Sequence, residues 1–364
     1  MTQADFEAAG LYDPASPTAD ERLQLLEWLV SRGVGLESMQ QAHARGFLLF
    51  VASSGQMRER PSLTQQDLMT ELGESAETLD EFRTSLALPP ALPGAPWCTT
   101  AEVELFRGVQ HGVGLFGLAE MKRLSRVIGS AVSRIAEAAA STERERMRKS
   151  LSSGATELEI AKGSLAVTHA IATPAMLASG LLRVHMELSL QRARGRGRTL
   201  VEETVTGCVG FVDLVGSTSL SRRLSPEQLG KVVDHFEDVA HEVAIRRDGR
   251  VVKFIGDEVM FVTSGPEAAC DIALTMVETF EGNPDVTPRA GLAWGPMLDR
   301  GGDYYGPIVN LAARLAELAV PREVLASTDV VEALASTALA YESAGRRQLR
   351  GFDEPVSLVS IRRG

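Results

Sequence analysis

Hydrophobic positions in the first half of the chain follow the 3.6-residue period of an amphipathic helix. Leu23, Leu26 and Leu29 recur at near-helical spacing, and Gly33 ends that run. Shorter runs of the same kind follow it along the chain. Residues 1–191 are therefore predicted to form an all-helical domain.

Two long helices are predicted in the second part of this domain, over residues 118–149 and from Thr156 to Gln191. A Pro-rich break at residues 88–96 separates them from the shorter helices, because proline has no backbone N–H to donate. The last helix runs into the segment RARGRGR. Its arginines and glycines predict a solvated, flexible linker over residues 192–203.

The pattern changes after this linker, where β-branched runs alternate with amphipathic helices. Val205–Val212 predicts a buried strand and Pro226–Arg247 a helix. Arg250–Ile255 and Val259–Thr263 flank a Gly-Asp-Glu turn and predict a hairpin. Mixed strands with helices packed on one face predict an α+β fold for residues 204–364.

Composition and charge restrict the classes of function. Hydrophobic residues make up 44% of the 364 positions and charged residues 23%, which is typical of a globular protein that is long enough for two domains. The formal net charge of −11 argues against broad non-specific binding to nucleic acid, because that binding depends on Lys and Arg contacts to phosphate. We expect no nucleic acid among the partners.

Cysteine usage and the N-terminal segment predict a cytoplasmic location. Cys98, Cys208 and Cys270 lie far apart without metal-ligand spacing, which predicts buried, reduced residues. The N-terminus lacks the basic start and apolar core of a secretory signal. Between Lys162 and Arg183 there is no Asp, Glu, Lys or Arg, but this stretch is too weakly apolar for a membrane span. We expect no transmembrane segment.

Two acidic residues are expected at neighbouring strand ends. Asp213 follows the first predicted strand, just before a Gly216-Ser217 turn whose backbone N–H groups suit phosphate oxygens. Asp257 lies at the tip of the predicted hairpin. If that hairpin lies beside the first strand, the two carboxylates converge on hard, oxygen-preferring cations. Taken singly, each Asp has a structural turn as its alternative.

Three segments carry a resemblance to a known family: FVDLVGST, KFIGDEVMF and DYYGPIVNLAARL. In this order and at comparable spacing, they resemble the signature segments of class III nucleotide cyclases. The resemblance covers residues 204–364, including the closing LRGFDEPVSL. It implies a ferredoxin-like, palm-type catalytic domain behind the all-α domain. The implied reaction converts ATP to 3′,5′-cyclic AMP and pyrophosphate.

The resemblance also implies the metal ligands. Asp213 and Asp257 match the family's pair that holds two Mg²⁺ or Mn²⁺ ions, with the Leu214 carbonyl as a further ligand. One ion would lower the pKa of the ribose 3′-OH for attack on the α-phosphate. The other would neutralise the leaving pyrophosphate.

Four further residues match the base-reading and transition-state groups of the family. Lys253 matches the residue that reads adenine N1, and Asp303 the acceptor for the N6 amine. Because a carboxylate would repel the guanine carbonyl, Asp303 favours ATP over GTP. Asn310 and Arg314, four apart on one helix face, match the residues that position the ribose and support charge on the α-phosphate.

In this family the metal pair comes from one catalytic domain and the other four residues from the facing one. A chain with all six residues is therefore expected to form a homodimer with two composite sites. A catalytically silent nucleotide-binding sensor and a GTP side activity stay open as alternatives. A diguanylate cyclase is disfavoured, because the hairpin reads IGDEV in place of a Gly-Gly-Asp/Glu-Glu-Phe loop.

The end of the first domain, SGATELEIAKGSLAV and the helix after it, resembles the regulatory domain of mycobacterial acid-sensing adenylyl cyclases. This shorter resemblance implies a dimerising domain that inhibits at neutral pH, releases activity in acid and can bind a fatty acid. His185 is the candidate for coupling protonation to a helix–coil exchange near the linker, because only histidine changes charge unaided near neutral pH. A neutral core or interface histidine is the alternative.

Overall fold

The computed structural model describes most of the chain, namely residues 1–170, 172–195, 203–216, 222–282, 286–335 and 339–364. The chain divides into two compact units, Met1–Arg192 and Ala193–Gly364. Each unit has its own clusters of buried hydrophobic side chains.

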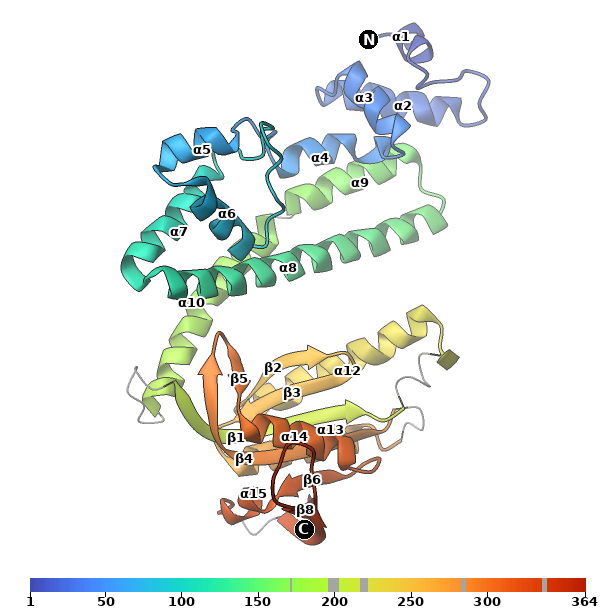
Figure 1. Ribbon diagram of the computed structural model, residues 1–364. Helices are drawn as coiled ribbons and strands as arrows, with labels where there is room; N and C mark the ends of the chain where they lie inside the picture. The colour runs from blue at the N-terminus through green and yellow to red at the C-terminus, as the bar shows by residue number, and fades with distance from the viewer. Residues whose placement is uncertain (171, 196–202, 217–221, 283–285, 336–338) are drawn as a thin grey trace. The chain divides into compact units, whose positions relative to one another are not determined.

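The first unit is helical over the described residues, apart from loops and one isolated β-bridge (Figure 1). Its elements are α1 (Gln3–Ala8), α2 (Ala19–Ser31), α3 (Leu36–Ala44), the 3-10 helix η1 (Leu48–Phe50), α4 (Val51–Met57), α5 (Gln65–Leu72), α6 (Ala76–Ser85), α7 (Val103–Phe116), α8 (Leu118–Ser152), α9 (Glu157–Ala170) and α10 (Ala172–Gly195). One buried cluster joins α1 to α4 with α9, and a second joins α5 to α8. The prediction of an all-helical part is confirmed.

Helix α5 begins and ends where its sequence supplies caps. The Thr64 hydroxyl accepts a hydrogen bond from the Asp67 main-chain N at 3.3 Å, and Asp67 Oδ2 accepts one from the Thr64 main-chain N at 2.8 Å. This reciprocal pair satisfies donors that an uncapped helix would leave unpaired. Gly73 ends the helix at φ 68°, a left-handed conformation that favours glycine.

The helix predicted from Thr156 to Gln191 is found in α9 and α10, but it does not end where it was predicted to end. α9 covers Glu157–Ala170 and α10 begins at Ala172, and residue 171 between them lies outside the described part of the chain. At its other end α10 continues to Gly195, because Arg and Ala are good helix formers. The first residues of the predicted flexible linker are therefore helical, and residues 196–202 lie outside the described part of the chain.

In the described part of the chain, no helix combines the length and the apolar composition that crossing a membrane requires. The described residues of the weakly apolar stretch between Lys162 and Arg183 belong to α9 and α10.

The second unit is built on an eight-stranded sheet in the order β2-β3-β1-β4-β6-β8-β7, with β5 paired to β4. Its strands are β1 (Thr204–Leu214), β2 (Gly249–Ile255), β3 (Glu258–Thr263), β4 (Pro288–Arg300), β5 (Asp303–Tyr305), β6 (Val324–Ser327), β7 (Leu339–Arg347) and β8 (Val356–Arg363). Its helices are α12 (Pro226–Arg246), α13 (Pro266–Thr279), α14 (Pro307–Leu318) and α15 (Thr328–Glu332). β2 and β3 form the predicted hairpin, and the α+β class is confirmed.

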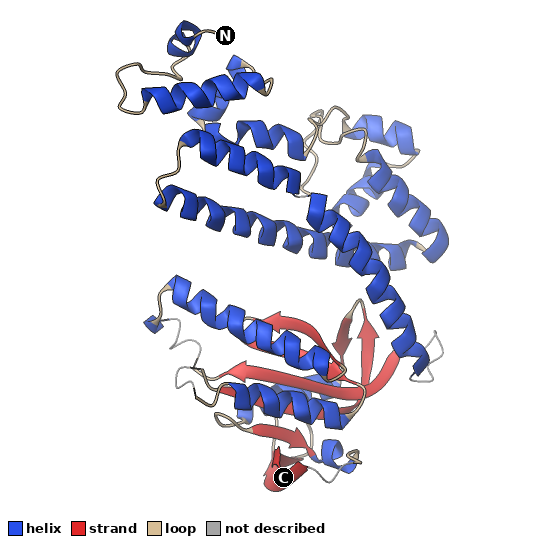
Figure 2. Cartoon of the chain, turned by 180° about the vertical axis from the view of Figure 1, so that it is seen from behind, coloured by secondary structure: helices blue, strands red, loops and turns tan. Residues whose placement is uncertain are grey.

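Helices cover both faces of this sheet, so the prediction that they pack on one face is wrong (Figures 1 and 2). α12 and α13 pack with Cys208 and Val212 of β1, whereas α14 packs with Val209 and Phe211. Successive residues of a strand point to opposite faces, so a strand buried along its whole length needs cover on both. The continuous apolar run of β1 already carried this signal.

Helix α14 approaches the sheet closely at Gly291 of β4. A Cβ atom on Gly291 would lie 2.1 Å from the main-chain N of Ala316 and 2.2 Å from the main-chain O of Ala312. A larger residue does not fit, because these backbone atoms cannot move aside as a flexible side chain does. This contact fixes the helix that carries Asn310 and Arg314 against the sheet.

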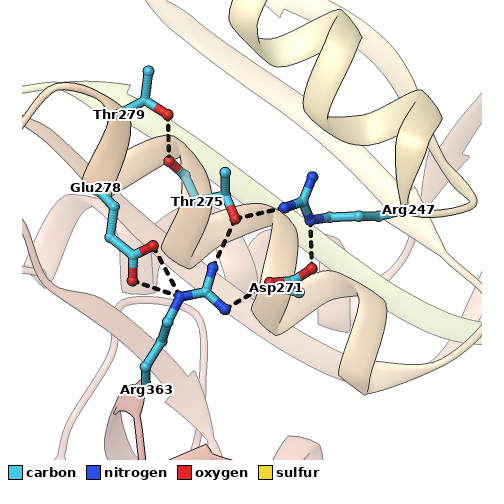
Figure 3. Close-up of polar contacts among 6 residues, drawn as sticks. All are labelled: Arg247, Asp271, Thr275, Glu278, Thr279 and Arg363. Atoms are coloured by element: carbon cyan, nitrogen blue, oxygen red, sulfur yellow. Dashed lines mark hydrogen bonds and ion pairs between the residues drawn. The ribbon is translucent and has the colours of Figure 1, made fainter.

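A polar network ties the last strand to α13 and to the end of α12 (Figure 3). Arg363 of β8 donates at 2.8 Å to each of three residues of α13, namely Asp271, Thr275 and Glu278. Arg247, directly after α12, donates to the same Asp271 and Thr275. Burial alone would raise the pKa of Asp271, but the hydrogen bonds from the two arginines outweigh it and hold that pKa below its ordinary value.

The three cysteines are buried free thiols. Burial raises the pKa of Cys98 to about 11 and that of Cys270 to about 12, and it raises the pKa of Cys208 well above its ordinary value. Protonated thiols are poor nucleophiles and poor metal ligands. The prediction that these residues are buried is therefore confirmed.

Candidate active site

Two sequence-predicted residues lie where β1 passes the β2–β3 hairpin. Asp213 lies opposite Glu258 in the antiparallel pairing of β1 with β3. The main-chain N of Leu214 donates to the main-chain carbonyl of Asp257 at 3.4 Å, so the hairpin tip lies beside the end of β1. The structure therefore brings the Asp213 and Asp257 positions together.

Arg289 of β4 is a candidate that the sequence patterns did not reveal. Its Nη2 and Nε donate to Asp213 Oδ2 at 2.7 and 3.0 Å. Its Nη1 donates to the carbonyls of Glu317 and Ala319 at the end of α14, at 2.5 and 3.2 Å. The side chains of Arg289 and Asp213 are only 22% and 20% exposed. The available signal was an arginine directly before an apolar run of β4, residues 290–298, since charges buried to this extent are nearly always paired.

Glu258 is a second residue that was missed. Burial, together with the charge of Asp213 and of other nearby carboxylates, raises the pKa of Glu258 to about 7. The other carboxylates are those of Glu317 and Asp257, and Arg289 opposes the shift. Carboxylates gathered in this way repel one another, so the site favours a cation. The position of Glu258, directly after Asp257 in a buried strand, was the signal in the sequence.

The residues present fit a site for divalent cations. Asp213 and Asp257 carry hard carboxylate oxygens at neighbouring positions, and burial, then the charges of Asp213, Glu317 and Asp257, raises the pKa of the adjacent Glu258. Among the described residues, no group of three or more His, Cys, Asp or Glu side chains is arranged to hold a metal ion. Main-chain or substrate oxygens would therefore complete the coordination.

Lys253 and Asp303 form a second pair, drawn from β2 and β5. Lys253 Nζ donates to Asp303 Oδ2 at 2.5 Å, and Asp303 Oδ1 accepts a hydrogen bond from the Tyr304 main-chain N at 2.8 Å. The two side chains are 36% and 25% exposed, so both remain accessible to a ligand. A donor and an acceptor side by side can read the edge of a purine base.

Asn310 and Arg314 lie on the outer face of α14, whose inner face is buried against the sheet. Arg314 Nη1 donates to both carboxylate oxygens of Glu317 at 2.6 and 2.7 Å. The three residues line a depression of about 540 Å³, which the loop at residues 350–353 closes on its other side. Helical spacing thus gives this face an amide and a guanidinium for a polar ligand.

The remaining candidates have simpler surroundings. Leu214 is buried at the end of β1, and Gly216 lies in the turn after it at φ 78°, which favours glycine. Ser217 lies outside the described residues. His185 is exposed on α10 in the first unit.

Comparison with known proteins gives the family. Residues 201–360 match the family model of the adenylate and guanylate cyclase catalytic domain. Residues 4–190, half of the chain, match the family model of the adenylate cyclase regulatory domain. The chain belongs to the adenylate cyclase family.

Relatives of this cyclase extend over nearly its full length. An uncharacterized protein of Mycobacterium tuberculosis is 33% identical to it over 363 residues, which cover 98% of the cyclase and 93% of that protein. A protein named pH-sensitive adenylate cyclase from the same species is 29% identical over 358 residues, covering 94% and 88%. The crystal structure of the adenylyl cyclase CyaB from P. aeruginosa covers 45% of the cyclase and 97% of its own chain, at 23% identity and a TM-score of 0.41.

Proposed function

We propose that this cyclase converts ATP to 3′,5′-cyclic AMP and pyrophosphate at two composite sites of a homodimer. The observation that carries the proposal is the meeting of Asp213 and Asp257 beside Arg289 in a carboxylate-rich site. Cyclases of this family use divalent metal ions, bind ATP and work as dimers. A chain with these groups in place is suited to catalysis as well as to nucleotide binding.

Asp213, Asp257 and the Leu214 carbonyl would hold two Mg²⁺ or Mn²⁺ ions, which when bound activate the ribose 3′-OH and neutralise the departing pyrophosphate. Arg289 fixes the orientation of the Asp213 carboxylate through its two hydrogen bonds to Oδ2. The four hydrogen bonds that Arg289 donates leave one N–H of its Nη2, which can donate to a triphosphate oxygen as a charge-assisted bond. The main-chain N–H groups of Gly216 and Ser217 are proposed to bind phosphate oxygens as well.

Lys253 and Asp303 are proposed to select adenine. Lys253 Nζ would donate to N1, an acceptor in adenine, and the Asp303 carboxylate would accept a hydrogen bond from the N6 amine. Guanine carries an N–H at N1 and a carbonyl at O6, so it would oppose both groups. Their contact in the chain supports a shared role, since it already places a donor beside an acceptor.

Asn310 and Arg314 are proposed to act on the substrate held by the partner subunit. Asn310 would position the ribose, and Arg314 would donate to the α-phosphate oxygens as negative charge develops there. A preorganised donor aimed at developing charge is among the largest single contributions to catalysis. Each subunit would therefore give its metal pair to one site and the other four residues to the second site.

Exposed apolar residues on α10 support a pairing of two copies. Leu177, Leu181, Val184 and Leu188 are between 40% and 55% exposed. Their spacing of four, three and four residues is that of a coiled-coil seam. Apolar side chains aligned in this way are stabilised when a second helix covers them. We propose that α10 is part of the homodimer contact in the first unit.

The composite site is tested by mixing two inactive variants, Asp257→Ala and Arg314→Ala. A dimer with one subunit of each kind holds one intact site, because its Asp pair and its Arg314 come from different chains. Random pairing should restore about a quarter of the wild-type rate of cyclic AMP formation with Mn²⁺-ATP. Sites built within single chains would give no recovery, which contradicts the proposal. Mixing each variant with itself is the control.

We further propose that residues 1–191 regulate the catalytic part, residues 204–364, through the linker at 192–203, and that they inhibit it at neutral pH. The match of this region to the adenylate cyclase regulatory domain supports the proposal. The name of the pH-sensitive relative supports acid as the signal. Binding of a fatty acid and a cytoplasmic location stay predictions.

His185→Ala is expected to flatten the pH–activity profile of the full chain. Protonation of His185 would add a positive charge on α10 as pH falls, which would favour the active state in acid. The measurement is the ratio of turnover at about pH 6 to turnover at about pH 8. His43→Ala, an exposed histidine of α3, is the matched control. An unchanged ratio in His185→Ala would remove the residue from the mechanism.

A further inference from the structure

Glu317 lies in the last turn of α14 and connects two arginines. Its carboxylate accepts from Arg314 Nη1 at 2.6 and 2.7 Å. Its main-chain carbonyl accepts from Arg289 Nη1 at 2.5 Å. Arg289 in turn is bonded to Asp213, so the backbone at residue 317 is anchored to the metal-binding end of the sheet.

The contact with Glu317 leaves most of the Arg314 guanidinium available. Both hydrogen bonds of the pair use the same nitrogen, Nη1, and do not engage Nε or Nη2. The Arg314 side chain is 41% exposed, so those two nitrogens can reach a ligand while Nη1 is held. In a bidentate arginine–carboxylate pair, the carboxylate accepts from two nitrogens of the guanidinium, which would leave fewer donors for the substrate.

An arginine at this exposure is otherwise free to occupy many rotamers. Fixing such a side chain before the substrate arrives avoids an entropy cost in the transition state. Glu317 can fix it because its own backbone is held by Arg289 and because α14 packs tightly on the sheet at Gly291.

We propose that Glu317 is a positioning residue for Arg314, which it orients toward the α-phosphate of the substrate. This inference rests on the proposed function, since it requires that Arg314 act on the substrate. Glu317 acts within its own subunit, on the arginine that serves the partner's metal pair.

Glu317→Gln tests the proposal, because it removes the negative charge that holds Arg314 and keeps the length of the side chain. The main-chain carbonyl of residue 317, which accepts from Arg289, is unaffected. In the full chain, kcat with Mn²⁺-ATP should fall about two- to five-fold. An exposed ion pair changes the population of one side-chain rotamer by about this factor. KM should change less than two-fold, because the contact matters in the transition state. Glu242→Gln, which removes the exposed Glu242–Arg246 pair of α12, is the matched control and should leave both constants unchanged.

Mixed dimers separate positioning from a general effect on α14. When Glu317→Gln is added to the Asp257→Ala subunit, it lies beside the working Arg314, and the rate of the mixed dimer should fall two- to five-fold. When it is added to the Arg314→Ala subunit, it has no working arginine beside it and alters only the carboxylates near that subunit's metal pair, so the loss should be smaller than in the first dimer. Equal loss in both dimers, or no loss in the first, overturns the proposal. No turnover even without Glu317→Gln would refute the composite site itself, and the inference would fall with it.

Discussion

Asp257→Ala should lower the rate of cyclic AMP formation by on the order of a thousandfold, because it removes a charged ligand where metal-assisted catalysis gains most of its rate. The mechanism predicts this loss at every concentration of Mn²⁺, since Asp213 alone cannot hold two ions. The assay follows product formation from ATP under saturating nucleotide. Arg289 keeps its bonds to Asp213 in this variant, so the fold at the strand ends should be preserved.

Asp234→Ala provides the control for that experiment. Asp234 is exposed on α12, and its replacement makes the same change in charge and size away from the strand ends. It should leave turnover and the melting temperature unchanged. An Asp257→Ala variant with wild-type turnover would mean that the two aspartates have a structural role in a turn and do not bind metal.

Exchanging the base-reading pair should have the second largest effect. The double variant Lys253→Glu and Asp303→Cys carries the residues typical of guanylyl members of the family. Turnover of ATP should fall by at least about a hundredfold, because a site built to hydrogen-bond one base leaves buried groups unpaired against another. Turnover of GTP should rise relative to ATP, which is measured by competition between the two nucleotides.

The control for this exchange is Lys231→Glu, which reverses a charge on the surface of α12. It should leave the ratio of ATP to GTP turnover as it is in the wild type. A double variant that still strongly prefers ATP would place base selection elsewhere in the site. The single variants should both lose activity, because each leaves one member of the Lys253–Asp303 ion pair without its partner.

Candidate site residues could be predicted from the sequence where a local pattern of strand and turn residues determines their position. Asp213 and Asp257 could be predicted because each follows a strand signal and precedes or occupies a turn. Arg289 and Glu317 could not, because their roles depend on contacts between β1, β4 and the end of α14. These contacts join residues far apart in sequence, and no spacing rule brings them together.

The failures among the fold predictions have a similar origin. The helical start of the linker depends on competition between helix propensity and the flanking chain, which is weakly encoded. The cover on both faces of the sheet could have been predicted, since β1 is apolar without alternation. The assumption of one solvated face was therefore an error of interpretation.

The three buried thiols can be used to measure local unfolding of the protein by their rates of chemical labelling. Cys98 belongs to the first unit, whereas Cys208 and Cys270 belong to the second. A thiol-specific reagent reacts only when the surrounding packing opens, because burial keeps these groups protonated and covered. The labelling rate of Cys98 would measure local opening of the first unit, and the rates of Cys208 and Cys270 would measure opening of the second unit, without an engineered probe.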